Sequence, residues 1–145
     1  MDRVDRDILR LLEKDGRIPY TELAERIGLS PNATSERVRR LKERGFIRGI
    51  VAQIDPAALG LSLSALIEVK MESTTTATQF EARAAATPGV IRALTTTGRY
   101  DWLLEVIARD QADLHRIIEA LRAGGLTRDT NSRVVVADRR YALAR

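Results

Sequence analysis

The spacing of the apolar residues changes once along this chain, and the change divides the chain into two parts. Up to Gly45, apolar side chains recur every three or four positions, as at Val4, Ile8 and Leu11, which is typical of amphipathic helices. Over residues 61–72 they alternate with polar ones, which is typical of a strand with one buried face. A helical part followed by a mixed part predicts an α+β fold in two domains.

The first part is predicted to hold three helices, over residues 2–14, 19–27 and 30–44. Asp2 fits the N-cap of the first helix, because its carboxylate can accept from the amides of the first turn. Ser30 gives the third helix the same kind of cap, and Pro31 has a φ that is already helical. With a short turn at Gly28 between the second and third helices, the arrangement predicts a helix-turn-helix.

The third predicted helix has the surface that DNA recognition requires. Its inward positions are Thr34, Val38 and Leu41, and its outward positions are polar. Small polar and basic side chains reach base edges and phosphates in a groove about 12 Å wide, and phosphate neutralisation makes such binding salt-sensitive. The alternative is an ordinary three-helix core with a solvated charged face. Apart from Glu36 and Glu43, the charged residues here are basic: Arg37, Arg39, Arg40, Lys42, Arg44 and Arg48.

An apolar segment joins the two parts of the chain. Residues 46–54 have the composition of a strand, and Asp55-Pro56 ends it. Such a strand would be exposed in a monomer, which predicts a partner copy. We therefore expect three regions: a helix-turn-helix domain over 1–45, a hinge strand and linker over 46–60, and a second domain over 61–145.

The second part is predicted to follow the order strand, helix, strand, strand, helix, strand. Its helices are expected over residues 77–87 and 110–123. This βαββαβ order is that of a ferredoxin-like domain, in which both helices cover one face of an antiparallel sheet. The uncovered face predicts a homodimer that forms through the sheet. The four strands are expected over residues 61–72, 90–97, 102–108 and 128–137.

Composition narrows the possible functions. The 145 residues include no cysteine and one histidine, His115, which excludes disulfides, iron–sulfur clusters and zinc sites built on cysteine or imidazole ligands. We expect no metal, no cofactor and no enzyme activity, because no nucleophile–base set or Gly-rich phosphate loop is present. No apolar run approaches the roughly 20 residues that span a bilayer, and the charged first residues do not form a secretion signal. We expect a cytoplasmic protein without a membrane partner.

The net charge of +4 lies mainly in the first third of the chain. The first 50 residues hold 12 Lys and Arg against 9 Asp and Glu. This excess agrees with nucleic-acid binding, although a basic surface by itself is a weak indication.

The predicted turn at residues 98–101 has two interpretations. Gly98 and Asp101 are ordinary choices for a plain hairpin turn. Alternatively, Asp101 accepts hydrogen bonds from a ligand's ammonium group, and Gly98 lets the ligand approach the backbone. Residue types alone favour the plain turn.

Ordered motifs along nearly the whole chain resemble one family of regulators. In the first part they are DRVDRDIL at 2–9, DGRI at 15–18, LAERIGLSP at 23–31, ERVRRL at 36–41 and GFI at 45–47. In the second part they are TTGRYD at 96–101 and TNSRVVV at 130–136. This set closely resembles the leucine-responsive regulator/asparagine regulator (Lrp/AsnC) family, the feast/famine proteins.

The resemblance implies a fold, an assembly and a function. It implies a winged-type helix-turn-helix, a hinge strand and a βαββαβ sensing domain that forms dimers, which in this family often assemble into tetramers or octamers. It implies double-stranded DNA and a small effector, usually an amino acid, as partners. By position, the family's DNA-binding residues fall on Ser30, Asn32, Thr34, Ser35, Arg37, Arg39 and Arg40. Its effector loop falls on Thr96, Thr97, Gly98, Arg99, Tyr100 and Asp101.

Three functions are therefore compared. The first is a sequence-specific transcription regulator that responds to an amino acid, and the turn at 98–101 then belongs to its effector site. The second is a DNA-compacting architectural protein, which uses the same helices with little base readout. The third is an enzyme or its regulatory subunit, which the residues do not favour. One departure from the family is Pro19, which stands where a capping Ser or Thr is common.

Overall fold

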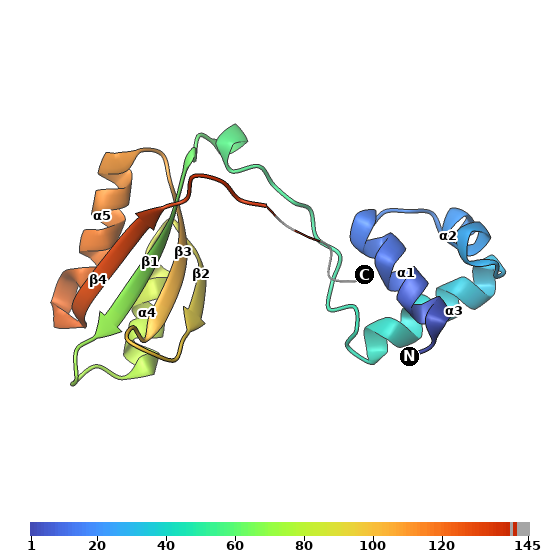
Figure 1. Cartoon of the computed structure of the whole chain (residues 1–145), viewed down its shortest axis with the longest axis horizontal. Coiled ribbons are helices and arrows are strands. Elements are labelled where there is room, and N and C mark those ends of the chain that lie inside the picture. The colour runs from blue at the N-terminus through green and yellow to red at the C-terminus, as the bar shows by residue number, and fades with distance from the viewer. Residues whose placement is uncertain (140, 142–145) are drawn as a thin grey trace. The chain divides into compact units, whose positions relative to one another are not determined.

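The computed structural model describes residues 1–139 and 141, which fall into two units joined in series (Figure 1). The first unit contains residues 1–53, with which Arg139 and Tyr141 group, and the second contains residues 54–138. The predicted domain limits at 45/46 and 60/61 stay a prediction. The last residues of the predicted 61–145 domain lie outside the described part of the chain.

Three helices pack around a small apolar core in the first unit. They are α1 (Arg3–Lys14), α2 (Tyr20–Ile27) and α3 (Pro31–Glu43). Asp2 caps α1 by accepting from the Asp5 amide at 2.8 Å, and Gly28 turns the chain after α2 with a φ of 71°. These features confirm the predicted helices and caps, whereas Pro19 leaves α2 without a side-chain cap. The buried core consists of Ile8, Ile18, Leu23, Val38 and Leu41.

The segment after α3 differs from its prediction. The amides of Phe46 and Ile47 donate to the Leu41 carbonyl at 2.9 and 3.2 Å and so close α3. Residues 46–54 then form no strand, and no described residue pairs with the backbone of 48–54. A strand needs a neighbour for its N–H and C=O groups, and the described residues supply none here. The expected hinge strand is thus wrong for the single chain, which continues into a short 3-10 turn, η1 (Ala57–Leu59).

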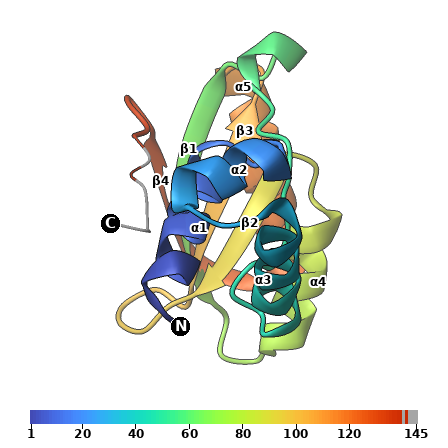
Figure 2. The same ribbon diagram turned by 90° about the vertical axis from the view of Figure 1, so that its right-hand side faces the viewer.

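The second unit is a four-stranded antiparallel sheet in the order β2-β3-β1-β4, which can be followed in Figure 2. This order confirms the predicted ferredoxin-like arrangement and the hairpin between the second and third strands. A 3-10 turn, η2 (Ala123–Gly125), precedes the last strand. The elements are β1 (Leu63–Met71), α4 (Ala77–Ala86), β2 (Val90–Thr95), β3 (Trp102–Ala108), α5 (Gln111–Arg122) and β4 (Thr127–Val134).

The described residues bury one face of this sheet and leave the other open. In β1, Ile67 and Val69 are fully buried, whereas Leu66 and Glu68 between and beside them remain partly exposed. The buried face packs against both helices. The centroid of the Phe80 ring of α4 lies 5.5 Å from that of the Trp102 ring of β3. The opposite face has no covering element among the described residues, as the period-two pattern predicts.

Gly89 provides a test of how tightly this core is packed. A Cβ at Gly89 would lie 2.5 Å from Ile117 Cδ1 and 2.7 Å from the Ile107 carbonyl oxygen. The backbone φ of Gly89 is +95°. We expect Gly89→Ala to lower the free energy of unfolding by about 3 kcal/mol, because overpacking and a left-handed conformation each cost about 1–3 kcal/mol. Urea denaturation measures the loss. Gly98→Ala is the matched control, since Gly98 has a φ of +113° but no atom within 4 Å of its Cβ position. Equal losses in the two variants would contradict the packing argument.

Candidate DNA-binding and effector sites

The outer face of α3 is the candidate DNA-binding surface. Val38 and Leu41 anchor the opposite face in the core, each with 1% exposure. Because residues three and four positions apart share one face of a helix, this anchoring turns a row of polar residues outward. The exposed members of that row are Asn32, Ser35, Arg39, Arg40 and Glu43.

Two of the predicted DNA-binding residues serve α3 itself. Thr34 is fully buried, and its Oγ1 donates to the Ser30 carbonyl at 3.0 Å. Its predicted inward position is therefore confirmed, and its assignment as a DNA contact is wrong because the side chain points into the core. The Ser30 Oγ accepts from the Ala33 amide at 3.2 Å and caps the helix. Ser30 is exposed, so its hydroxyl lies at the end of the helix that would approach DNA.

Arg37 is held by two carboxylates from the start of α1. Its guanidinium donates to Asp2 Oδ2 at 2.7 Å and to Asp5 Oδ1 at 2.8 Å, and its side chain is 33% exposed. These hydrogen bonds, first that to Asp2, raise the pKa of Arg37. The Asp5 amide and then Arg37 lower the pKa of Asp2. Because the pKa of Asp2 is lower in the folded than in the unfolded state, its ionised carboxylate stabilises the fold. This stabilisation is fully present above the unfolded-state pKa and is lost as the pH falls through the folded-state pKa.

Arg39 and Arg40 are also paired within the helix. Glu36 Oε1 accepts from Arg39 at 2.7 Å and from Arg40 Nε at 3.0 Å, and its Oε2 accepts from Arg39 Nε at 2.9 Å. Arg39 makes a further ion pair with Glu43. All four side chains are at least 40% exposed. The hydrogen bonds from Arg39 and then Arg40 lower the pKa of Glu36. The outer face of α3 is thus a network of four charges that sum to zero.

The remaining cations of the basic cluster lie near the end of α3. The Arg44 guanidinium is 5.0 Å from the centroid of the Phe46 ring, a cation–π contact. Lys42 and Arg48 are exposed. Sequence spacing correctly indicates a concentration of positive charge, but carboxylates pair with three of its six cations, Arg37, Arg39 and Arg40.

The predicted effector loop closes the β2–β3 hairpin of the second unit. The Thr96 amide donates to the Asp101 carbonyl at 2.9 Å, and Thr96 Oγ1 donates to the Tyr100 carbonyl at 3.0 Å. Gly98 supplies the turn conformation, and the space beside it is open. Thr97 and Arg99 are exposed. The structure therefore supports a hairpin turn whose backbone is accessible to a ligand.

Asp101 is anchored to β1. Its Oδ1 accepts from Lys70 Nζ at 2.9 Å, and its Oδ2 accepts from the Met71 amide at 2.8 Å. These two hydrogen bonds, that from Lys70 first, lower the pKa of Asp101. Each carboxylate oxygen has a second lone pair, so Asp101 can fix the loop and still accept a donor from a ligand. Sequence reasoning missed this anchoring, because Lys70 lies far away in the chain.

A small polar cavity adjoins the start of β4. It measures about 190 Å³ and is lined by Arg122, Thr127, Arg128, Asp129 and Thr130. Among the described residues, nothing hydrogen-bonds the buried Thr127 Oγ1. Asp129 links the cavity to the loop, because it accepts from the Tyr100 hydroxyl at 3.3 Å and lies 3.9 Å from the Arg99 guanidinium. A buried hydroxyl without a partner is uncommon, and no sequence motif indicates that of Thr127.

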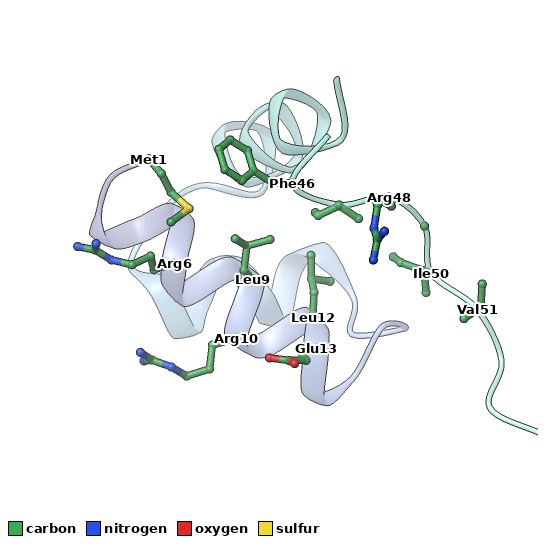
Figure 3. A pocket seen from close by; sticks show the side chains of 12 residues that line it. Met1, Arg6, Leu9, Arg10, Leu12, Glu13, Phe46, Arg48, Ile50 and Val51 are labelled. Atoms are coloured by element: carbon green, nitrogen blue, oxygen red, sulfur yellow. The ribbon is translucent and has the colours of Figure 1, made fainter. Parts of the chain in front are cut away.

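A larger groove lies in the first unit, between α1 and the segment after α3. It has a volume of about 860 Å³. Leu9 and Leu12 of α1 point toward the segment that carries Phe46 and Ile50 (Figure 3). Val51 next to it is 89% exposed. The apolar residues of the predicted hinge therefore remain partly uncovered in the single chain.

Neither a metal-binding group nor a membrane-spanning helix occurs among the described residues. No group of three or more His, Asp or Glu among residues 1–139 and 141 has a geometry that could hold a metal ion. No helix in this part of the chain is long and apolar enough to cross a bilayer.

Two family models match the chain, one for each unit. A winged helix-turn-helix DNA-binding model matches residues 1–48. An Lrp/AsnC ligand binding domain model matches residues 64–141.

Curated relatives and solved structures agree with these models. The HTH-type transcriptional regulator AldR of Mycolicibacterium smegmatis is 42% identical over 85% of this chain and 74% of its own. The leucine-responsive regulatory protein of Escherichia coli is 34% identical over 95% of this chain and 86% of its own. A transcriptional regulator of Neisseria meningitidis, solved as a complex with L-Met, is 28% identical and superposes with a TM-score of 0.90 over 99% of this chain and 95% of its own. Escherichia coli AsnC is 26% identical, with a TM-score of 0.84 over 100% and 99% of the two chains.

The position of Arg37 predicts a structural role. We expect Arg37→Ala to lower the free energy of unfolding by about 1–2 kcal/mol, because it leaves the buried Asp5 carboxylate without its cation. Thermal and urea unfolding of the variant measure the loss. If Arg37 instead contacted only DNA, the variant would unfold like the wild type and differ only in DNA affinity.

Proposed function

Since the chain belongs to the Lrp/AsnC family of transcriptional regulators, we propose that α3 reads double-stranded DNA and that the region around residues 96–101 senses an amino acid. The chain is an effector-responsive DNA-binding regulator, as its two matched domains and its relatives indicate. One observation carries the proposed DNA site: a separate core holds α3 so that a continuous polar row faces outward. This is the presentation that a recognition helix needs.

The DNA site would use both ends of that row. Asn32 and Ser35 lie in the first turns of α3, the end that usually meets base edges. Arg39 and Arg40 lie farther along, where guanidinium groups contact bases or phosphates. Ser30 contributes from the N-cap, and Arg37 acts indirectly by fixing α3 to α1. Thr34 has no part in the contact.

The effector site would combine the loop with the neighbouring cavity. The open space at Gly98 gives a ligand access to the backbone, and the second lone pairs of Asp101 can accept hydrogen bonds from it. The cavity of about 190 Å³ is smaller than the roughly 300 Å³ at which drug-sized sites begin, which favours a small ligand. Thr96, Thr97, Arg99 and Tyr100 would border it. The L-Met bound to the Neisseria regulator supports an amino acid as the ligand class.

The proposed assembly is a homodimer formed through the free face of the sheet, with tetramers or octamers built from it. That face carries Leu66, Leu103 and Ile107, which are all partly exposed. The apolar side chains of residues 46–54 would also be covered in the assembly. A second copy can supply the backbone partner that the predicted hinge strand lacks in the single chain.

Two further parts of the proposal concern what the protein does not do and where it acts. A regulator of this kind is not an enzyme, which agrees with the names of its relatives. We propose that it acts without a cofactor and in the cytoplasm, as expected of a DNA-binding regulator. The alternative of an architectural DNA-compacting protein predicts uniform protection in a footprint, whereas sequence-specific regulation predicts a few regularly spaced protected sites.

Arg39 and Arg40 test the DNA site. We expect Arg39→Ala and Arg40→Ala to weaken binding to a duplex selected by the wild type from a random pool. A base-reading arginine should cost about tenfold or more at that sequence, and a phosphate-contacting one should reduce the salt slope by about 1. Arg116→Ala is the matched control, because Arg116 is an equally exposed arginine in an ion pair on α5. Unchanged affinity in both α3 variants at all salt concentrations would refute the site.

Asp101 tests the effector site. A thermal-shift screen of the twenty amino acids first identifies a binder, which raises the melting temperature. We then expect Asp101→Ala to abolish the change in DNA affinity caused by that amino acid, because the loop loses its hydrogen bonds to Lys70 and Met71 and the ligand loses an acceptor. Basal DNA binding should persist, since an effector acts only through its different affinities for two states. Glu81→Ala, at an exposed position of α4, is the control. A full response in Asp101→Ala would show that the loop is only a turn.

A further inference from the structure

We propose that Glu36 is a positioning residue that withholds Arg39 and Arg40 from DNA of arbitrary sequence and releases them at a matched site. The inference rests on the proposed DNA-binding function of α3. According to this proposal, the sequence specificity of the α3 surface depends in part on a carboxylate, although most charged residues around it are basic.

The geometry places Glu36 at the centre of the outer face. Its two carboxylate oxygens accept three hydrogen bonds, two from Arg39 and one from Arg40, at 2.7 to 3.0 Å. Among the described residues, Glu36 is the one that forms ion pairs with both arginines. Both Nε atoms point at it, so each guanidinium is turned along the helix surface.

The solvent exposure of the network makes it exchangeable. Arg39 and Arg40 are 58% and 67% exposed, and Glu36 is 40% exposed. Exposed ion pairs are weak, since water and salt compete with them. DNA can therefore displace Glu36 from Arg39 and Arg40. The free energy of this step depends on which DNA groups replace the hydrogen bonds that are lost.

Phosphates and base edges offer different exchanges. A phosphate can accept from an arginine, but it leaves the Glu36 carboxylate unpaired beside another negative charge. At a G·C pair the guanine O6 and N7 accept from an arginine, and the cytosine N4 amino group can donate to a carboxylate. A matched major-groove edge thus satisfies both members of the pair, whereas the backbone satisfies only the cation. Glu36 consequently penalises binding that relies on phosphates alone.

Glu43 provides a matched control within the same helix. It pairs with Arg39 only. If Glu43 loses its charge, Arg39 keeps both hydrogen bonds to Glu36, and Arg40 is unaffected. Glu36→Gln and Glu43→Gln therefore change the net charge equally, but only the first releases both arginines.

The test is a titration of a random-sequence duplex with the full-length wild type, Glu36→Gln and Glu43→Gln over a range of salt concentrations. We expect Glu36→Gln to bind this duplex at least about fivefold more tightly at low salt. Its salt slope should steepen by about 1 to 2, since each additional phosphate contact adds about 0.9. Glu43→Gln should change both quantities much less. Selection from a random pool should enrich a narrower set of sequences with the wild type than with Glu36→Gln. Unchanged melting temperatures show that each variant is folded.

A second comparison separates positioning from simple repulsion. Glu36→Gln is repeated in a background that carries Arg39→Ala and Arg40→Ala. If Glu36 acts through these arginines, its substitution no longer steepens the salt slope there. An equal gain in Glu36→Gln and Glu43→Gln, a gain that persists without the arginines, or weaker binding by Glu36→Gln would each overturn the inference. If the wild type binds no duplex at any salt concentration, the proposed DNA-binding function itself fails and the inference with it.

Discussion

The burial of Val38 and Leu41 against Ile8 and Leu23 is the contact on which the proposed DNA-binding surface depends. These side chains have at most 1% exposure, and they fix the rotation of α3 about its own axis. Because a helix presents residues three and four apart on one side, fixing one side also determines the other. The polar row of α3 thus follows from an apolar contact on its opposite side, and a large cavity in this core would cost about 2–5 kcal/mol.

The second unit applies the same one-sided burial to a sheet, with a different result. Its free face alternates leucine and isoleucine with ion pairs such as Glu68–Arg133 at 3.0 Å and Arg92–Glu105 at 3.1 Å. A mixed face of this kind favours a partner that matches both its apolar and its charged positions, because an unmatched buried charge is costly. In the proposed homodimer, this face would supply both the buried area and the register of the two copies.

Local patterns predicted nearly all of the fold. The helices and strands of both units follow from hydrophobic period, and the caps at Asp2 and Ser30 follow from residue type, because both depend on neighbours within a few positions. The hinge at 46–54 is the exception, since a strand exists only where another backbone meets it. The composition of residues 46–54 is typical of a strand, but the described residues contain no backbone partner for it.

The candidate sites were less predictable, because side-chain partners are chosen by contacts between distant residues. Arg37 pairs with Asp2 across 35 positions, and Lys70 with Asp101 across 31. The family motifs assign Arg37 to DNA binding and Asp101 to effector binding. In the structure, Arg37 also joins α3 to α1, and Asp101 also anchors the β2–β3 loop to β1. The sequence does not indicate that the Thr127 hydroxyl is buried without a partner, because this property arises from the packing around β4.

The contact between Asp2 and Arg37 has a practical consequence for protein engineering. Chain termini usually tolerate added sequence, but Asp2 caps α1 and holds α3 at the same time. An affinity tag or fluorescent reporter fused directly ahead of Asp2 would begin beside α3 and would disturb the packing of α3 against α1. A flexible spacer before Asp2 would remove that crowding. Fusions with and without the spacer would show how far DNA binding depends on an intact first turn of α1.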